Sequence, residues 1–123
     1  MSNRTSVKMQ IAAHLDACMA LDDVLGCVIV SRTGALMGKM VEQGISVPSF
    51  AAMGATILGS SEAAAGLMHL SRPSSIFVEV DEGGILVMGA GKNALITLII
   101  NKSADINSLK GELAVIASNI GEE

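Results

Sequence analysis

The chain has 123 residues and a net charge of −4 at pH 7; half of its residues are apolar and 16% are charged. This length fits one domain over residues 1–123, and the apolar fraction excludes a disordered chain. The acidic balance and the low aromatic content of 2% argue against nucleic acid as a partner, because phosphate contacts need cations and base stacking needs rings.

A first amphipathic helix is predicted over residues 7–21, because apolar side chains recur there at steps of three and four. They are Val7, Ile11, Leu15, Cys18 and Leu21. Residues 24–31 are predicted as a strand, and residues 35–42 as its hairpin partner across a short turn that contains glycine. Pro48 suits a first helical turn, so the longest helix is predicted over residues 48–70.

Three further strands and a last helix complete the chain. The strands are predicted over residues 75–81, 85–90 and 94–101, with hairpin turns at 81–84 and 91–93. The strand at 94–101 is apolar on both faces, which is typical of a central strand between two helical layers. The apolar positions of the last helix are Ile106, Leu109, Leu113, Ile116 and Ile120. The order α-ββ-α-βββ-α predicts an α/β fold of the α+β sandwich type, in which a five-stranded antiparallel sheet lies between helices.

The predicted helix at 48–70 has no polar face, and Glu62 is its sole fully charged residue. Small residues recur along it at every fourth position: Ala51, Ala55, Gly59 and Ala63. Such a ridge lets another backbone approach closely, so we expect contact with a second subunit; tight packing on the chain's own sheet is the alternative. Met53 and Met68, on a face of larger residues, are predicted to fill gaps in the core.

The segment Gly89-Ala90-Gly91-Lys92 invites comparison with phosphate-binding loops. Such a loop needs glycine where this chain has Leu86, and Ser or Thr where it has Asn93. A helix must also follow the loop and point its N-terminus at the phosphate, whereas a strand is predicted here. We therefore interpret the segment as a hairpin turn.

Two other groupings fail as chemical sites. His14 and Cys18 lie four residues apart on the first helix, and Cys27 is a conceivable third zinc ligand. Because Cys27 lies in a strand predicted to be buried, core cysteines and a surface histidine are the favoured interpretation. The Ser60–Ser61 pair and His69 lack the Gly-x-Ser-x-Gly elbow of serine nucleophiles. No catalytic residue, metal ligand or cofactor is predicted, and we expect a protein that is not an enzyme.

The cysteine content and the hydropathy pattern predict the compartment. Two cysteines do not make a disulfide framework, and the polar residues 1–8 do not form a secretory signal. The longest uncharged run, residues 43–61, contains Pro48, three glycines and four serines, which makes it a poor membrane span. We therefore expect a cytoplasmic protein without a membrane-spanning segment.

Three segments of the chain resemble those of roadblock/dynein-light-chain domains. Residues 25–36 resemble the opening hairpin, residues 50–68 the small-residue central helix and residues 78–98 the closing meander. The resemblance implies a roadblock/profilin-like arrangement, with the central helix on one face of the sheet and the other two helices on the opposite face. It also implies a homodimer in which the edge strand at 75–81 pairs with its twin and the central helices lie side by side. The candidate dimer contacts are Ala51, Ala55, Gly59, Ala63, Ile76, Phe77 and Val78.

The family is mostly non-enzymatic, and its members that resemble the bacterial gliding-motility protein MglB regulate a small Ras-like GTPase. The resemblance therefore implies a dimeric module that regulates or scaffolds such a GTPase across the paired central helices. Polar groups at the rim of an apolar surface set register and specificity, and the candidates expected to be exposed there are Glu62, His69 and Arg72. The alternative is a small-ligand sensory module, for which Thr97 is one of few buried polar candidates, or a general scaffold subunit.

Overall fold

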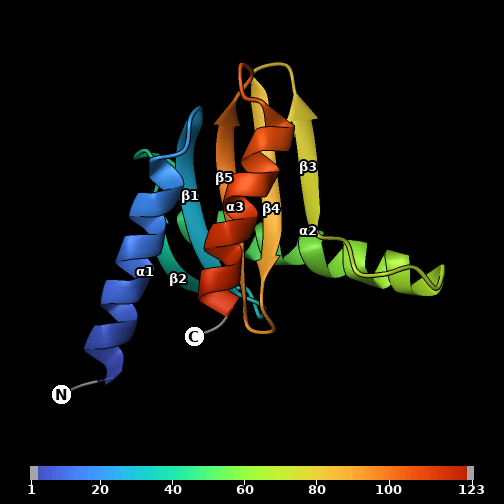
Figure 1. Cartoon of the computed structure of the whole chain (residues 1–123), viewed down its shortest axis with the longest axis horizontal. Helices are drawn as coiled ribbons and strands as arrows, with labels where there is room; N and C mark the ends of the chain where they lie inside the picture. Colours follow the sequence, from blue (N-terminus) through green and yellow to red (C-terminus); the bar gives the residue numbers. More distant parts are fainter. Residues whose placement is uncertain (1–2, 122–123) are drawn as a thin grey trace.

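The structure is a computed structural model that describes residues 3–121, with side chains from residue 9 onward. This range contains three helices and five strands in the predicted order α-ββ-α-βββ-α (Figure 1). Their bounds are α1 Asn3–Met19, β1 Val24–Ser31, β2 Leu36–Met40, α2 Val47–Leu67, β3 Ser75–Val80, β4 Gly83–Ala90, β5 Ala94–Asn101 and α3 Ile106–Gly121. None of the helices described here is long and apolar enough to cross a membrane.

The strands form one antiparallel sheet in the order β2-β1-β5-β4-β3. β5 lies between β1 and β4, where Leu98 pairs with Cys27 on one side and with Leu86 on the other. Nearly all of its residues are buried, which confirms the prediction of a central strand covered on both faces. β3 is an edge strand, so one of its sides has no neighbouring strand within residues 3–121.

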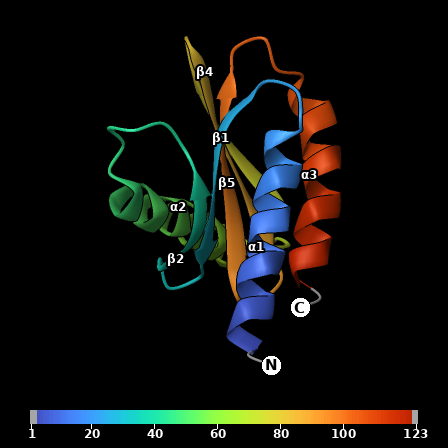
Figure 2. The ribbon, with the colours of Figure 1, turned by 90° about the vertical axis from the view of Figure 1, so that its left-hand side faces the viewer.

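Helices cover both faces of the sheet. Figure 2 shows the layers from the side: α1 and α3 lie on one face and α2 lies on the other, as the family resemblance implied. The α1/α3 face holds the larger core, in which Cys18, Cys27 and Leu113 are fully buried. A smaller core around Leu58 lies beneath α2. Val7, predicted for the first core, lies outside the residues whose side chains the structure describes.

α2 ends at Leu67 rather than at residue 70. His69 adopts a left-handed backbone conformation, with φ of 58°. The N–H of Leu70 donates to the carbonyl oxygen of Ala65 at 2.9 Å. The N–H of His69 donates to the carbonyl oxygen of Gly66 at 3.1 Å. This is a Schellman cap, which ends a helix at the left-handed residue; glycine usually occupies that position, so a histidine gives no sequence signal for the end.

The turn between β3 and β4 is shorter than predicted. It consists of Asp81 and Glu82, and both following glycines belong to β4. A side chain at Gly84 would overlap the ring of Phe77 on the neighbouring strand. Gly84 is therefore required by packing rather than by a turn, which the sequence pattern does not distinguish.

Candidate interaction surface

α2 crosses one face of the sheet and continues past its edge. Figure 1 shows its C-terminal part and the following connection projecting beyond β3, away from the other strands. The α2 residues buried against the sheet are Val47, Ala51, Gly54 and Leu58. Between residues 63 and 72, by contrast, every residue except Ala65 is exposed. The end of α2 therefore has no layer beneath it in the described part of the chain.

The projecting end carries large apolar side chains. Leu67, Met68 and Leu70 are 82%, 70% and 67% exposed, and Met53, earlier on the helix, is 61% exposed. The prediction that Met53 and Met68 fill the core is wrong, because both side chains are largely exposed. Grouped apolar side chains of this size are uncommon on soluble monomers and typically mark a surface that another molecule covers.

The small-residue ridge of α2 turns from the sheet toward solvent. Ala51 is fully buried, Ala55 is half-buried, and Gly59 and Ala63 are exposed. The cause is geometric: four residues rotate about 40° more than one helical turn, so a ridge at every fourth residue winds around the helix. Ala51 consequently packs on its own sheet and offers no surface to a second chain. A Cβ added at Gly59 would meet nothing within 4 Å.

α2 approaches the sheet closely at Gly54, which lies outside the ridge. A Cβ there would stand 2.6 Å from Oγ1 of Thr97 on β5, which is closer than real Cβ contacts come. Thr97 is 1% exposed, and its hydroxyl has no hydrogen-bond partner among the described residues. Tight packing on the chain's own sheet, the alternative left open by the sequence, thus occurs at Gly54 and Ala51.

β3 presents an open edge beside the projecting helix. Ile76 packs at the border of the core beneath α2, and Phe77 at the border of the opposite core. Val78 and Val80 are 36% and 52% exposed. Among the described residues β3 pairs with β4 alone, so the backbone on the other side of β3 is open to a further strand. The predicted contacts Ile76, Phe77 and Val78 all lie on this edge strand.

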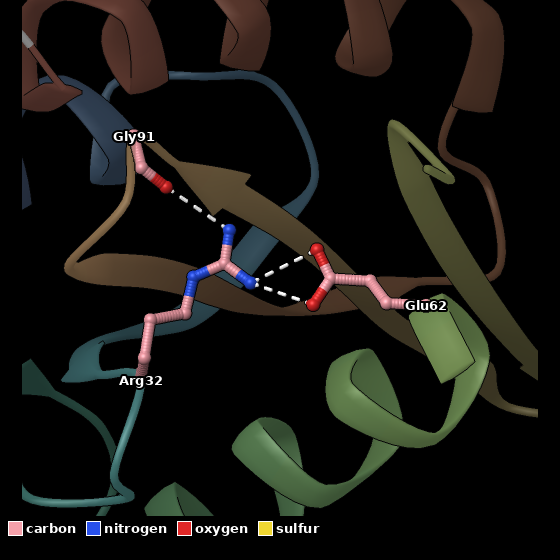
Figure 3. A network of polar contacts seen from close by, with 3 residues as sticks. All are labelled: Arg32, Glu62 and Gly91. Atoms are coloured by element: carbon pink, nitrogen blue, oxygen red, sulfur yellow. Dashed lines mark hydrogen bonds and ion pairs between the residues drawn. The ribbon is translucent and has the colours of Figure 1, made fainter. Parts of the chain in front are cut away.

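A half-buried ion pair fastens α2 near the point where it leaves the sheet. Arg32, in the turn after β1, donates from Nη1 to both carboxylate oxygens of Glu62 at 2.9 and 3.0 Å (Figure 3). Its Nη2 donates to the carbonyl oxygen of Gly91, in the turn between β4 and β5, at 3.0 Å. A Cβ at Gly89 would stand 2.8 Å from Nη2, so glycine makes room for the guanidinium. One side chain thereby joins three segments that are far apart in the sequence.

Glu62 is therefore not the exposed rim residue that the sequence led us to expect. Its side chain is 20% exposed, and its carboxylate is engaged by Arg32. His69 and Arg72 are exposed, the first at the left-handed residue after α2 and the second in the connection to β3. Arg32 was missed by the sequence analysis, because its partners lie 30 and 59 residues away and no local pattern reveals such a separation.

Two pockets adjoin the ion pair. The basic pocket has a volume of about 430 Å³, and its lining residues are Arg32, Ala55, Gly59, Glu62, Arg72 and Lys92. The small-residue pocket has a volume of about 720 Å³ and shares Arg32, Glu62 and Arg72 with the first. Its other lining residues include Ser74, Ser75, Lys110, Gly111, Ala114 and Ser118. Glu62 and Arg72, two of the three predicted rim residues, thus meet at both pockets, whereas His69 lines neither.

The residues weighed as metal ligands do not gather into a site. Among the described residues, no group of three His, Cys, Asp or Glu side chains could hold a metal ion. Cys18 and Cys27 are buried free thiols, and the hydrogen bond with Cys27, together with burial, raises the pKa of the Cys18 thiol. The Gly91-Lys92 segment forms the hairpin turn between β4 and β5, as predicted.

A five-stranded antiparallel sheet between a pair of helices and a single crossing helix defines an α+β domain of the roadblock and profilin type. The model of the Roadblock/LC7 domain family matches residues 11–100, which is more than half of the chain. The chain belongs to this family. No curated protein matched the chain when compared by sequence.

Several solved structures share the fold. A structure described as MglB with a tetrameric arrangement has a TM-score of 0.82 at 16% identity, over 94% of this chain and 88% of that chain. Myxococcus xanthus MglB has a TM-score of 0.80 at 12% identity, over 98% and 96% of the two chains. Schizosaccharomyces pombe profilin has a TM-score of 0.65 at 16% identity, over 88% and 94%. At these identities the likeness shows the fold, and membership of the family supports a protein-interaction or regulatory module.

Proposed function

We propose that the protein forms a homodimer and that the dimer binds and regulates a small Ras-like GTPase. The observation that carries the proposal is the projection of α2 beyond the β3 edge, with Leu67, Met68 and Leu70 exposed on it. In a single chain these side chains contact water, at a free-energy cost of about 25 cal/mol for each Å² of apolar surface left uncovered. A second subunit that continues the sheet would cover them.

The direction of the projection fits pairing of β3 with its twin. Neighbouring strands lie about 4.8 Å apart, so a strand added outside β3 extends the sheet in the direction in which α2 projects. Each α2 would then lie partly over its own sheet and partly over that of its partner, beside the other α2. Gly59 and Ala63, which face outward, leave room for the two helix backbones to approach closely.

The GTPase partner is inferred from the family. Roadblock domains that resemble MglB regulate a small Ras-like GTPase, and MglB structures are among those that share this fold. His69 is exposed directly after the C-terminal end of α2, and Arg72 is exposed in the connection to β3. Glu62, which is one fifth exposed, lies where α2 leaves the sheet. The γ-phosphate orders the switch loops of a GTPase, so a protein that binds those loops has different affinities for the two nucleotide states.

Sedimentation equilibrium at micromolar concentration tests the dimer. The expected mass is twice the 12.6 kDa of one chain, and a single-chain mass at every concentration would contradict the proposal. Gly59→Leu is expected to weaken the dimer, because bulk added at a close contact costs about 1–3 kcal/mol. Gly111→Leu is the matched control: it also changes a helix glycine with nothing within 4 Å of an added Cβ, but on α3, and should leave the dimer mass unchanged.

Titration calorimetry tests the GTPase, using the Ras-like GTPase encoded nearest in the source genome, loaded with a GTP analogue or with GDP. His69→Glu with Arg72→Glu is expected to weaken binding by about tenfold, or 1.4 kcal/mol, while sedimentation still shows a dimer. Lys39→Glu, an exposed charge reversal on the opposite edge strand, is the control. Equal affinity in the two nucleotide states would remove the claim of regulation. The absence of binding in both states would overturn the proposal that a Ras-like GTPase is the partner.

A further inference from the structure

Basic side chains are concentrated around the Arg32–Glu62 pair, although the chain as a whole is acidic. The chain has eight Lys and Arg residues and a net charge of −4. Four of these eight line the basic pocket or the small-residue pocket: Arg32, Arg72, Lys92 and Lys110. Within the described residues, Glu62 is the one carboxylate in either lining. Four cations against one anion leave a local excess of positive charge.

The basic pocket holds the densest part of this charge. Arg32 is engaged there by Glu62 and Gly91 through its two terminal nitrogens, while its Nε is buried without a hydrogen-bond partner among the described residues. Arg72 and Lys92 make no hydrogen bond or ion pair with another described residue. Two unpaired cations beside one pocket repel each other, and an anion bound between them converts that repulsion into attraction.

Two helix glycines line the pockets, and no contact among the described residues requires glycine at either position. Gly59 lines the basic pocket and Gly111 lines the small-residue pocket, and a Cβ added at either would meet nothing within 4 Å. Glycine in a helix interior destabilises the helix relative to alanine. The proposed dimer contact accounts for Gly59, and a molecule that approaches the backbone of α3 would account for Gly111.

The small-residue pocket is suited to the rest of a small molecule. It is an open hollow rather than an enclosed cavity, and its volume of about 720 Å³ leaves room for such a group. Ser74, Ser75 and Ser118 supply hydroxyls in its lining, and Ala114 supplies an apolar surface. The two pockets share Arg32, Glu62 and Arg72 in their linings, so they adjoin each other.

We propose that the basic pocket binds the phosphate of a small phosphorylated molecule whose body lies in the small-residue pocket. A phosphate carries close to two negative charges at neutral pH, which matches the two unpaired cations Arg72 and Lys92; a single carboxylate would leave one of them unpaired. The phosphate belongs either to a free phosphorylated compound or to a lipid headgroup, and the two sources are separated by experiment. The site shares Arg72 with the proposed GTPase contact, and it shares Ala55 and Gly59 with the proposed dimer ridge.

Titration calorimetry of the full chain with pyrophosphate tests the site. We expect saturable binding that Arg72→Gln with Lys92→Gln weakens by about tenfold or more, since each removed cation makes a charge-assisted hydrogen bond to phosphate. The matched control is Lys39→Gln with Lys102→Gln, which removes the same charge at exposed positions outside both pockets and should leave the affinity unchanged. Sedimentation of both double variants shows whether the dimer is intact.

Co-sedimentation with vesicles separates the two phosphate sources. Binding to vesicles of phosphatidylcholine with phosphatidylinositol phosphate, lost in the Arg72/Lys92 double variant, would support a lipid headgroup. Pyrophosphate binding without vesicle binding would support a free phosphorylated compound. Absence of both pyrophosphate binding and vesicle binding would overturn the site. An equal loss of affinity in the Lys39/Lys102 control would overturn it too. Because these measurements use the protein alone, their failure leaves the proposed GTPase function standing, and the reverse holds too.

Discussion

The two faces of the sheet differ in how completely the helices of the chain cover them. Among the residues whose side chains the structure describes, the core beneath α1 and α3 contains 18 buried residues, whereas the core beneath α2 contains 7. α1 and α3 lie along the strands, while α2 crosses them and projects past β3 (Figures 1 and 2). The first face is therefore a self-contained core, and the second leaves apolar side chains and a strand edge for another molecule. One sheet thus carries a closed core on one side and an exposed apolar surface on the other.

The largest effect is expected on the α1/α3 face. Leu113 is fully buried in the centre of α3, and Leu113→Ala removes side-chain contacts and leaves a cavity. The expected loss is about 2–5 kcal/mol in the free energy of unfolding, measured by urea denaturation at fixed protein concentration. A loss below about 1 kcal/mol would contradict the description of this face as a close-packed core.

Many buried residues of the α1/α3 face could be predicted from the sequence, because the spacing of apolar residues along a helix indicates which side of it is buried. The predicted apolar stripe of α3 matches its buried residues at Leu109, Leu113, Ile116 and Ile120. On the α2 face the same reasoning predicted the helix and its lack of a polar face, but not its packing. A ridge at every fourth residue winds around the helix, so Ala51 faces the sheet while Gly59 faces solvent.

The contacts that depend on distant segments could not be predicted from local pattern. Arg32 reaches Glu62 and Gly91 across 30 and 59 residues, and only the folded sheet brings their strands and turns together. The projection of α2 escaped prediction for a similar reason: hydropathy shows that a helix is apolar but not whether a sheet lies beneath it. Gly54 was missed because its close contact, Thr97, lies on another element.

The buried thiols give the α1/α3 face a dependence on alkaline pH. The pKa of Cys18 is raised in the folded chain, so the folded state keeps a proton that the unfolded state loses above its thiol pKa of about 9.0. Cys18 should therefore make stability fall above that pH, by about 1 kcal/mol over the first pH unit, whereas Cys27, whose pKa is lowered by its hydrogen bond with Cys18, makes stability rise as pH approaches that value from below. The chain has no tyrosine to add a phenolic ionisation there. Urea denaturation between pH 7 and 10 measures the slope, and an unchanged slope in Cys18→Ala would contradict the assignment.

The Arg32–Glu62 ion pair, at the point where α2 leaves the sheet, should contribute less to the free energy of unfolding than either core. Glu62→Gln removes the carboxylate from Arg32, and the pair is partly solvated, so the expected cost is about 1 kcal/mol. A double-mutant cycle with Arg32→Gln isolates the pairwise interaction energy. A coupling energy near zero would mean that the pair does not fasten α2, and that the helix is positioned by Leu58 and its neighbours alone.

The smallest effect on the stability of one chain is expected at Leu67. Its side chain is 82% exposed on the projecting end of α2, so Leu67→Ser should change the unfolding free energy of the dissociated chain by no more than about 0.5 kcal/mol. The same change should shift the dimer toward single chains in sedimentation equilibrium, because an apolar contact would be lost at the interface. Val115→Ser on the outer side of α3 is the matched control, being 63% exposed on the opposite face, and should leave the dimer intact. If both variants leave the dimer mass unchanged, the projecting end of α2 is not the dimer contact. Its exposed apolar side chains must then be covered by a different partner.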